Sequence, residues 1–273
     1  MSSKYFLFFF FFFWVGPAHR LFPEKIIIDN GPINSYICIM KVYRAKRLLN
    51  FDNNPKTVKG QRYGWKTAIL YLAPAASSGF NMCPMASAGC KAACLNTAGR
   101  GQMRSVQAGR INKTIYFMKD RATFLQQLEK EIRLFAERCR RQGYRPAVRL
   151  NGTSDVNWER FGLMEKFPGV QFYDYTKIYK RALKWAAGKL PKNYHITYSL
   201  NEDNKRQALY VLKRGGNISA VFRSKKLPKK FHGYRVTNAD NSDLRFIDPR
   251  NTIAGLYAKG KAIRDESGFV QDV

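Results

Sequence analysis

The chain has 273 residues, of which 45% are hydrophobic, so its composition excludes a chain too short or too polar to build a sizeable core. Its 48 Lys and Arg against 19 Asp and Glu give a formal net charge of +29, which indicates an acidic partner. Nucleic acid is the first candidate and an anionic membrane surface or a phosphorylated substrate the second, while a basic protein without such a partner is the alternative.

The first residues differ in amino-acid composition from the remainder of the chain. "MSSKYFLFFFFFFWVG" resembles a signal peptide superficially, but its run of Phe is much shorter than the about 20 residues that span a bilayer. No clear A-x-A cleavage site follows. We expect residues 1–39 to be a mis-assigned or disordered extension, with a signal or membrane anchor as the alternative, and no stable membrane association. Residues 40–273 are then expected to form a single α/β domain, because the basic residues spread along all of it favour a folded basic face over a basic tail.

The first predicted strand, 67–74, is followed by a Cys-rich loop at 81–101. Two helices are predicted within 103–120 and 120–143, the second capped by Asp120 and stopped by Gly143. Further strands are predicted at 146–155, 170–177, 194–202 and 217–224, with helical segments 158–169, 178–190 and 203–216 between them. The segments 234–243 and 244–249 are strand-like, and 252–262 fits strand or helix.

Strands that alternate with helices of about 10–15 residues indicate βα units and a parallel sheet. We expect a parallel βα barrel, partial or complete and similar to a TIM barrel, with an open doubly wound parallel sheet as the alternative. Polar residues at the carboxyl ends of the strands favour the barrel, because barrel active sites lie at that rim.

These polar strand ends are candidate ligand-binding positions, since parallel strands place them on one rim beside the Cys-rich loop. The candidates are Asn151, Thr153, Ser154, Asp155, Asp174, Thr176, Asn201 and Asp240. Asp155 is the best candidate for the partner of an amino group, being the only carboxylate in "NGTSD". Ordinary turn and helix-cap chemistry is the alternative for each of them.

Cys83, Cys90 and Cys94 lie within twelve residues, with the spacing C-x6-C-x3-C. Without a convincing secretory signal the expected setting is reducing, where such a cluster indicates metal binding or catalysis more than disulfides. Three thiolates can hold three irons of a [4Fe–4S] cluster and leave one iron open. Zinc with a fourth ligand, and simple buried thiols, are the alternatives. Cys139 lies on a predicted helix and is expected to be a buried thiol outside the cluster.

Three blocks carry a family resemblance: residues 64–101, "VRLNGTSDVNWE" and "VQFYDYTK". Over about residues 60 to 262 the chain resembles a phage family labelled gene-product-88-like. The resemblance implies phage origin, and with it a place in the host cell cytoplasm.

A wider resemblance comes from the position of the three-cysteine loop, after the first strand of a predicted βα barrel. In this respect the chain is similar to radical S-adenosylmethionine enzymes, whose three cysteines hold a [4Fe–4S] cluster and whose open iron chelates S-adenosylmethionine. The resemblance implies that Cys83, Cys90 and Cys94 are the cluster ligands and that Asn151 and Asp155 contact the methionine amino group. The chain departs from that family's usual C-x3-C-x2-C spacing and has no Gly-Gly-Glu.

Two functions are therefore expected as alternatives. The first is a radical S-adenosylmethionine-like iron–sulfur enzyme acting on nucleic acid or a nucleotide, with Tyr173, Tyr175 and Tyr198 as candidates for base stacking. The second is a non-catalytic nucleic-acid-binding protein with a structural zinc site, in which Lys and Arg contact phosphates.

Overall fold

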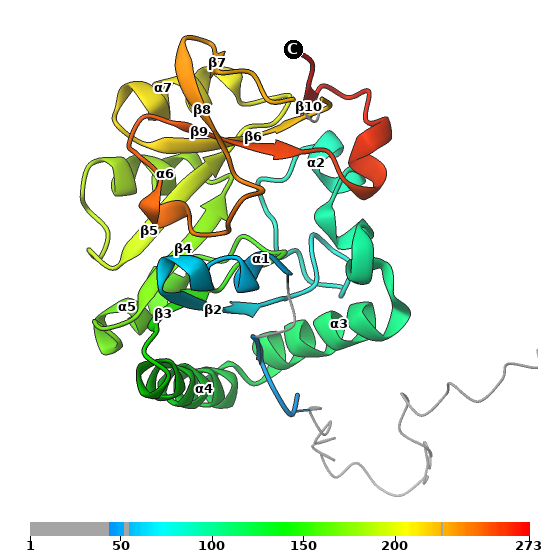
Figure 1. The fold of residues 1–273 in the computed structure, drawn as a ribbon. Helices are drawn as coiled ribbons and strands as arrows, with labels where there is room; N and C mark the ends of the chain where they lie inside the picture. The colour runs from blue at the N-terminus through cyan, green and yellow to red at the C-terminus, as the bar shows by residue number, and fades with distance from the viewer. Residues whose placement is uncertain (1–43, 52–54, 225) are drawn as a thin grey trace, which may run out of the picture. The chain divides into compact units, whose positions relative to one another are not determined.

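The computed structural model describes residues 44–51, 55–224 and 226–273. The predicted extension at 1–39 lies outside these residues. Lys41–Val273 make up one compact unit, in which a large sheet is flanked by helices (Figure 1).

A mostly parallel, ten-stranded sheet organises the described part of the chain (Figure 1). The order of its strands is β1-β2-β3-β4-β5-β6-β9-β8-β7, and β10 pairs with β6. The strands are β1 (Leu49–Asn50), β2 (Trp65–Leu70), β3 (Arg145–Arg149), β4 (Gln171–Thr176), β5 (Tyr194–Ser199), β6 (Asn217–Phe222), β7 (Lys230–Phe231), β8 (Tyr234–Asn238), β9 (Ile253–Tyr257) and β10 (Val270–Gln271). Only the outermost pairs, β1 with β2 and β7 with β8, are antiparallel.

The mixed α/β fold with a largely parallel sheet is confirmed. The strand order is a path with two ends, and no pairing of described residues joins β1 to β7, so closure into a barrel is not shown.

The helices are α1 (Pro55–Val58), α2 (Ala88–Ala92), α3 (Arg104–Lys119), α4 (Arg121–Arg141), α5 (Leu163–Lys166), α6 (Tyr179–Ala186) and α7 (Lys205–Lys213).

Helices α4, α6 and α7 pack against β3, β5 and β6 (Figure 1). The longest, α4, forms as its sequence predicts: the Asp120 carboxylate accepts from the Thr123 N–H at its start, and Gly143 takes a φ of +72° just after its end. Its buried side chains recur at three- and four-residue steps, and they pack in one core with Val148 and Phe172 of the sheet. We call the side of the sheet that carries this core the helix face.

The opposite side, which we call the inner face, is largely polar. It carries Arg149, Tyr173, Tyr175, Thr197 and Ser219, since these alternate with the apolar residues of the helix face along each strand. The segment 239–250, which runs from β8 to β9, covers part of this face instead of a helix. Within it, Phe246 packs edge-on against the rings of Trp65 and Tyr173.

The prediction of a strand at residues 244–249 was wrong. Residues 244–249 form a helical turn, η5 (Arg245–Ile247), because hydrogen bonds within the segment replace those of a ladder. The Ser242 hydroxyl accepts from the Leu244 N–H, and the buried Arg245 guanidinium donates to the Ser242 carbonyl. The ambiguous segment 252–262 resolves into β9 followed by the helical turn η6 (Gly260–Arg264).

The short strand β10 brings the end of the chain to the carboxyl edge of the sheet. β9 pairs with β6 along 218–222, and β5 pairs with the first residues of β6, 217–219. β10 pairs with Val221 and Phe222, so it lies beside β6 where β5 has left it. The end of the chain thus reaches the carboxyl edge of the sheet, where β5 and β6 no longer pair.

No helix in the described residues has the length and apolar character that crossing a membrane requires.

His195, at the start of β5, is buried, and its ring lies 4.4 Å from that of Trp185. Burial, with Arg245 and Arg250 nearby, lowers its pKa to about 3. The unfolded chain therefore binds a proton below pH ~6.5 that the folded chain does not, so stability falls as the pH drops through this range.

We expect the parent to lose about 2 kcal/mol more of its free energy of unfolding between pH ~8 and pH ~5 than His195→Phe does. Urea denaturation at both pH values measures this difference. The control is His232→Phe, because His232 is exposed. Equal pH dependence in the parent and His195→Phe would contradict the assignment.

Candidate functional site

A pocket of about 230 Å³ opens at the carboxyl edge of the sheet, over the inner face. The cysteine loop after β2 forms one wall, with all of Cys83, Cys90 and Cys94 lining it. The loop after β3 and the segment after β9 form two more walls. Its floor is the polar inner face, including Arg149, Tyr175, Ser199 and Ser219, and Asp243 of segment 239–250 also lines it and pairs with Arg149.

The three pocket cysteines are half-buried and not joined in disulfides. The Cys83 thiol lies 3.7 Å from the carbonyl of Thr153. Cys90 lies inside α2, whose start is capped by the Ser87 hydroxyl accepting from the Cys90 N–H at 3.2 Å. Cys94 follows α2 and begins the next helical turn. The loop and its capped helix thus place all three cysteines along one pocket.

The electrostatics of these thiols disfavour a nucleophilic role. Burial raises the pKa of Cys83 to about 11 and also raises the pKa of Cys94. The charge of Asp155 and of the other two thiolates adds to the rise of the Cys83 pKa, whereas Lys177 and Arg110 lower the pKa of Cys94. A catalytic cysteine needs a lowered pKa, so Cys83 and Cys94 do not fit a nucleophilic role.

Among the residues that the structure describes, no group of three or more His, Cys, Asp and Glu side chains is arranged to hold a metal ion. A single zinc ion with Zn–S bonds of about 2.3 Å needs its sulfur ligands about 3.8 Å apart. A [4Fe–4S] cluster lies between its ligands and holds them farther apart. The three cysteines line one pocket, and the structure of the described residues does not bring them to the spacing of a single zinc ion.

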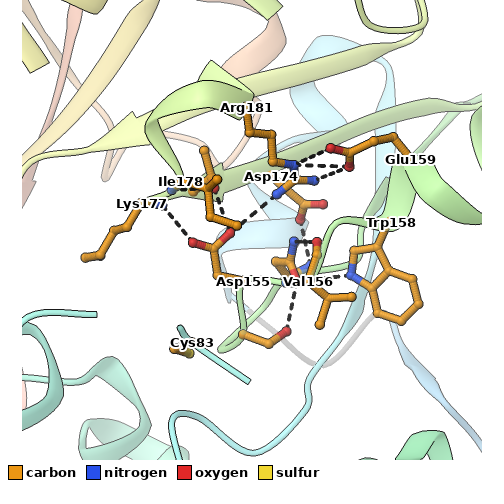
Figure 2. A network of polar contacts seen from close by, with 12 residues as sticks. Cys83, Asp155, Val156, Trp158, Glu159, Asp174, Lys177, Ile178 and Arg181 are labelled. Atoms are coloured by element: carbon orange, nitrogen blue, oxygen red, sulfur yellow. Dashed lines mark hydrogen bonds and ion pairs between the residues drawn. The ribbon is translucent and has the colours of Figure 1, made fainter. Parts of the chain in front are cut away.

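The "NGTSD" loop lines the pocket, but most of its polar atoms are already bonded within the protein (Figure 2). The Asn151 side-chain oxygen accepts from the Ser154 hydroxyl, the Val156 N–H and the Trp158 indole N–H. The Thr153 hydroxyl donates to a backbone carbonyl after β2. The side chains of Asn151 and Ser154 thus stabilise the loop. Because the Asn151 side-chain oxygen already accepts three hydrogen bonds, it has no free acceptor for the ligand that the sequence predicts.

Asp155 lies at the centre of a buried ionic network (Figure 2). Its carboxylate accepts from the Thr176 hydroxyl and the Lys177 N–H, both at 2.7 Å, and lies 3.4 Å from the Arg181 guanidinium. Arg181, whose side chain is 2% exposed, also pairs with Glu159 at 2.8 Å. Burial raises the pKa of Asp155, and Arg181 opposes the rise. The one carboxylate of "NGTSD" therefore belongs to a residue that lines the pocket, and both of its oxygens already accept hydrogen bonds from the protein.

Three predicted positions are not among those that line the pocket. Asp174 lies on the helix-face side of β4, where it accepts from the Asn151 N–H and the Tyr194 hydroxyl. Burial raises its pKa to about 7. Asn201 accepts from Asp203 in a turn, and Asp240 binds the Tyr257 N–H and the Lys259 ammonium. Each of these three side chains thus accepts hydrogen bonds within the protein. Thr176 does line the pocket.

The tyrosines predicted to stack bases divide in the same way. Tyr173 and Tyr198 are fully buried, and Tyr173 donates to Asp243 beneath segment 239–250. Tyr175 lines the pocket, under the guanidinium of Arg149.

Glu202 was not predicted from the sequence as a residue of the site. It follows β5 and binds the cysteine loop: its carboxylate accepts from the Ser87 hydroxyl at 2.8 Å and the Gly89 N–H at 2.6 Å. A Cβ on Gly89 would lie 2.7 Å from that carboxylate and 2.0 Å from the Ser267 hydroxyl. Its position in the polar end "SLNE" was the available signal, but no local pattern links it to Ser87, 115 residues away.

A model of the gene product 88 family matches residues 46–273. The chain belongs to this family. The match includes every described element around the pocket, and it agrees with the resemblance in the blocks around the cysteines and "NGTSD". No curated protein matches the chain. No solved structure matches it either, so the resemblance to radical S-adenosylmethionine enzymes has no support from these comparisons.

We expect Glu202→Ala to lower the free energy of unfolding by about 1–3 kcal/mol, because the Gly89 N–H and the Ser87 hydroxyl lose a charged acceptor. Chemical denaturation measures the change. Asp203→Ala, at the exposed neighbouring position, is the matched control and should change stability by less than about 0.5 kcal/mol. Equal effects of the two substitutions would show that Glu202 does not hold the cysteine loop.

We expect Arg181→Leu to cost about 3–5 kcal/mol, because it leaves Asp155 and Glu159 without their buried cation. Lys180→Leu, at the exposed neighbour on the same helix, is the control. Thermal and urea unfolding of both variants give the comparison. A loss from Arg181→Leu no greater than the control's would mean that the network is not balanced by this guanidinium.

Proposed function

We propose that this gene product 88 family member is an iron–sulfur protein in which Cys83, Cys90 and Cys94 hold a [4Fe–4S] cluster in the pocket at the carboxyl edge of the sheet. The observation that supports it is that all three cysteines of the C-x6-C-x3-C loop line one pocket and none is joined in a disulfide. When bound, such a cluster supplies one-electron chemistry and one iron open to a further ligand.

The residues around the pocket support this assignment through positioning and charge. Glu202 and Ser87 fix α2, so the position of Cys90 depends on a hydrogen bond between distant parts of the chain. Lys177 and Arg110 lie near Cys94, where their charge offsets that of thiolates. Phe269 and Ala262 form an apolar wall that limits the access of water. A partly dry pocket with nearby cations suits an anionic cluster.

We further propose that the ligand beside the cluster is S-adenosylmethionine and that the substrate is nucleic acid or a nucleotide. Asp155 is the pocket carboxylate suited to a ligand's amino group, and Lys177 is an ammonium suited to its carboxylate. The net charge of +29 supports an anionic substrate, and Tyr175 is an aromatic ring within the pocket.

Titration of the iron-loaded protein with S-adenosylmethionine tests the ligand. We expect Asp155→Asn to weaken the binding of S-adenosylmethionine.

We expect protein purified without oxygen to be brown, to absorb broadly near ~400 nm and to contain about four iron and four sulfide per chain. Cys83→Ala, Cys90→Ala and Cys94→Ala should each lose most of this iron, because every one removes a ligand. Iron and sulfide analysis and the absorption spectrum measure the loss.

Cys139→Ala is the matched control, because Cys139 is buried in α4 within the helix-face core and should leave the iron content unchanged. Colourless parent protein that binds one zinc ion would overturn the cluster in favour of a structural zinc site. Equal metal content in Cys90→Ala and the parent would remove the three-cysteine site altogether.

A further inference from the structure

The mouth of the pocket is bounded by two segments that are distant in sequence and in contact in space. One is residues 85–104 of the cysteine loop, and the other is η6 (Gly260–Arg264). A Cβ on Gly260 would lie 3.0 Å from the Cα of Ala98, and Ala262 packs with Ala93. Figure 1 shows the red turn of η6 beside α2. We call these two segments the rim.

The rim exposes apolar side chains that have no cover. Four large apolar residues on it are each more than half exposed: Met85, Leu95, Met103 and Ile263. Leu95 also lines the pocket, so this apolar surface is continuous with the pocket mouth. Exposed apolar side chains on segments that border a pocket are typical of a binding surface.

The rim is also basic. Lys91, Arg104, Lys261 and Arg264 are exposed on it. Residues 53–119, which include the whole cysteine loop, contain no Asp or Glu. The η6 turn is fixed in place, because the Arg223 guanidinium donates to the carbonyls of Ile263 and Asp265. The rim segments thus carry exposed cations as well as exposed apolar side chains.

We propose that the rim binds single-stranded nucleic acid and delivers it to the pocket mouth. The proposal rests on the nucleic-acid substrate of the proposed function and adds where and in which form it binds. Lys and Arg attract the phosphates, and the exposed apolar side chains contact base faces, which a single strand exposes and a duplex hides.

An anionic membrane surface also attracts basic and apolar side chains. It is usually bound by a long amphipathic helix that lies flat in the interface. On the rim, α2 (Ala88–Ala92) and η6 (Gly260–Arg264) are each only five residues long, and they surround a hollow. This shape fits a flexible strand that enters the hollow better than it fits a flat surface.

The test uses fluorescence anisotropy with a labelled, mixed-sequence single-stranded DNA, at salt concentrations from about 50 to 200 mM. Lys261→Ala/Arg264→Ala removes two rim charges, and Arg133→Ala/Arg140→Ala removes two exposed charges from α4, which packs on the helix face. We expect the rim pair to lower affinity about tenfold and to reduce the slope of log K against log salt by about 1.4. The α4 pair should change affinity less than about twofold.

Leu95→Ser/Ile263→Ser should lower the affinity for single-stranded DNA while leaving the salt slope unchanged, because it removes base contacts and no charge. Equal losses from the rim and α4 pairs, or tighter binding of a duplex of the same length, would overturn the proposal. So would binding of the parent to phosphatidylserine vesicles but not to DNA, if the rim pair abolished it.

Iron content separates this inference from the cluster assignment. The rim pair should keep the parent's iron and sulfide, because neither Lys261 nor Arg264 lines the pocket. A parent with a full cluster and no affinity for DNA would overturn the nucleic-acid substrate and the rim surface but leave the cluster standing. A parent without iron that still binds DNA through the rim would overturn the cluster alone.

Discussion

The ion pair between Arg181 and Asp155 is the interaction on which the candidate site most depends. It lies where the loop after β3 meets the end of β4, with both side chains largely removed from water. In such surroundings a carboxylate keeps its charge only if a cation and hydrogen-bond donors face it, and Asp155 has both. The loop after β3, which forms one wall of the pocket, is thus stabilised by an ion pair whose cation, Arg181, comes from α6 on the helix face.

The cysteine loop is held in a comparable way from the other side. Its helix α2 is too short to be stable alone, and Glu202, which follows β5, supplies acceptors at its start. The end of the chain adds Phe269 and Ala262 as an apolar wall. Three parts of the chain, after β2, after β5 and after β9, therefore determine where the thiols lie. A change at Glu202 should disturb the site as much as a change in the loop itself.

The inner face explains why the site lies on this side of the sheet. The helix face is occupied by apolar packing against α4, α6 and α7, whereas the inner face is polar and is covered in part by segment 239–250. Beyond segment 239–250, the side chains of Arg149, Tyr175 and Ser219 form the floor of the pocket. The exposed apolar and basic rim then surrounds the opening of this space.

The sequence by itself determined the α/β class, the parallel order of most strands, the capped helix α4 and the gathering of cysteines after the first long strand. These features follow from periodicity, cap residues and the geometry of parallel strands, which are local or generic. Only the tertiary structure decided that Asp155 lines the same pocket as the cysteines, that Asp174, Asn201 and Asp240 are bonded elsewhere in the protein, and that residues 244–249 form a helical turn. Those outcomes depend on which partner each polar atom meets across the fold, as Arg181 meets Asp155 and Glu202 meets Ser87, and no local pattern of residues encodes such pairings.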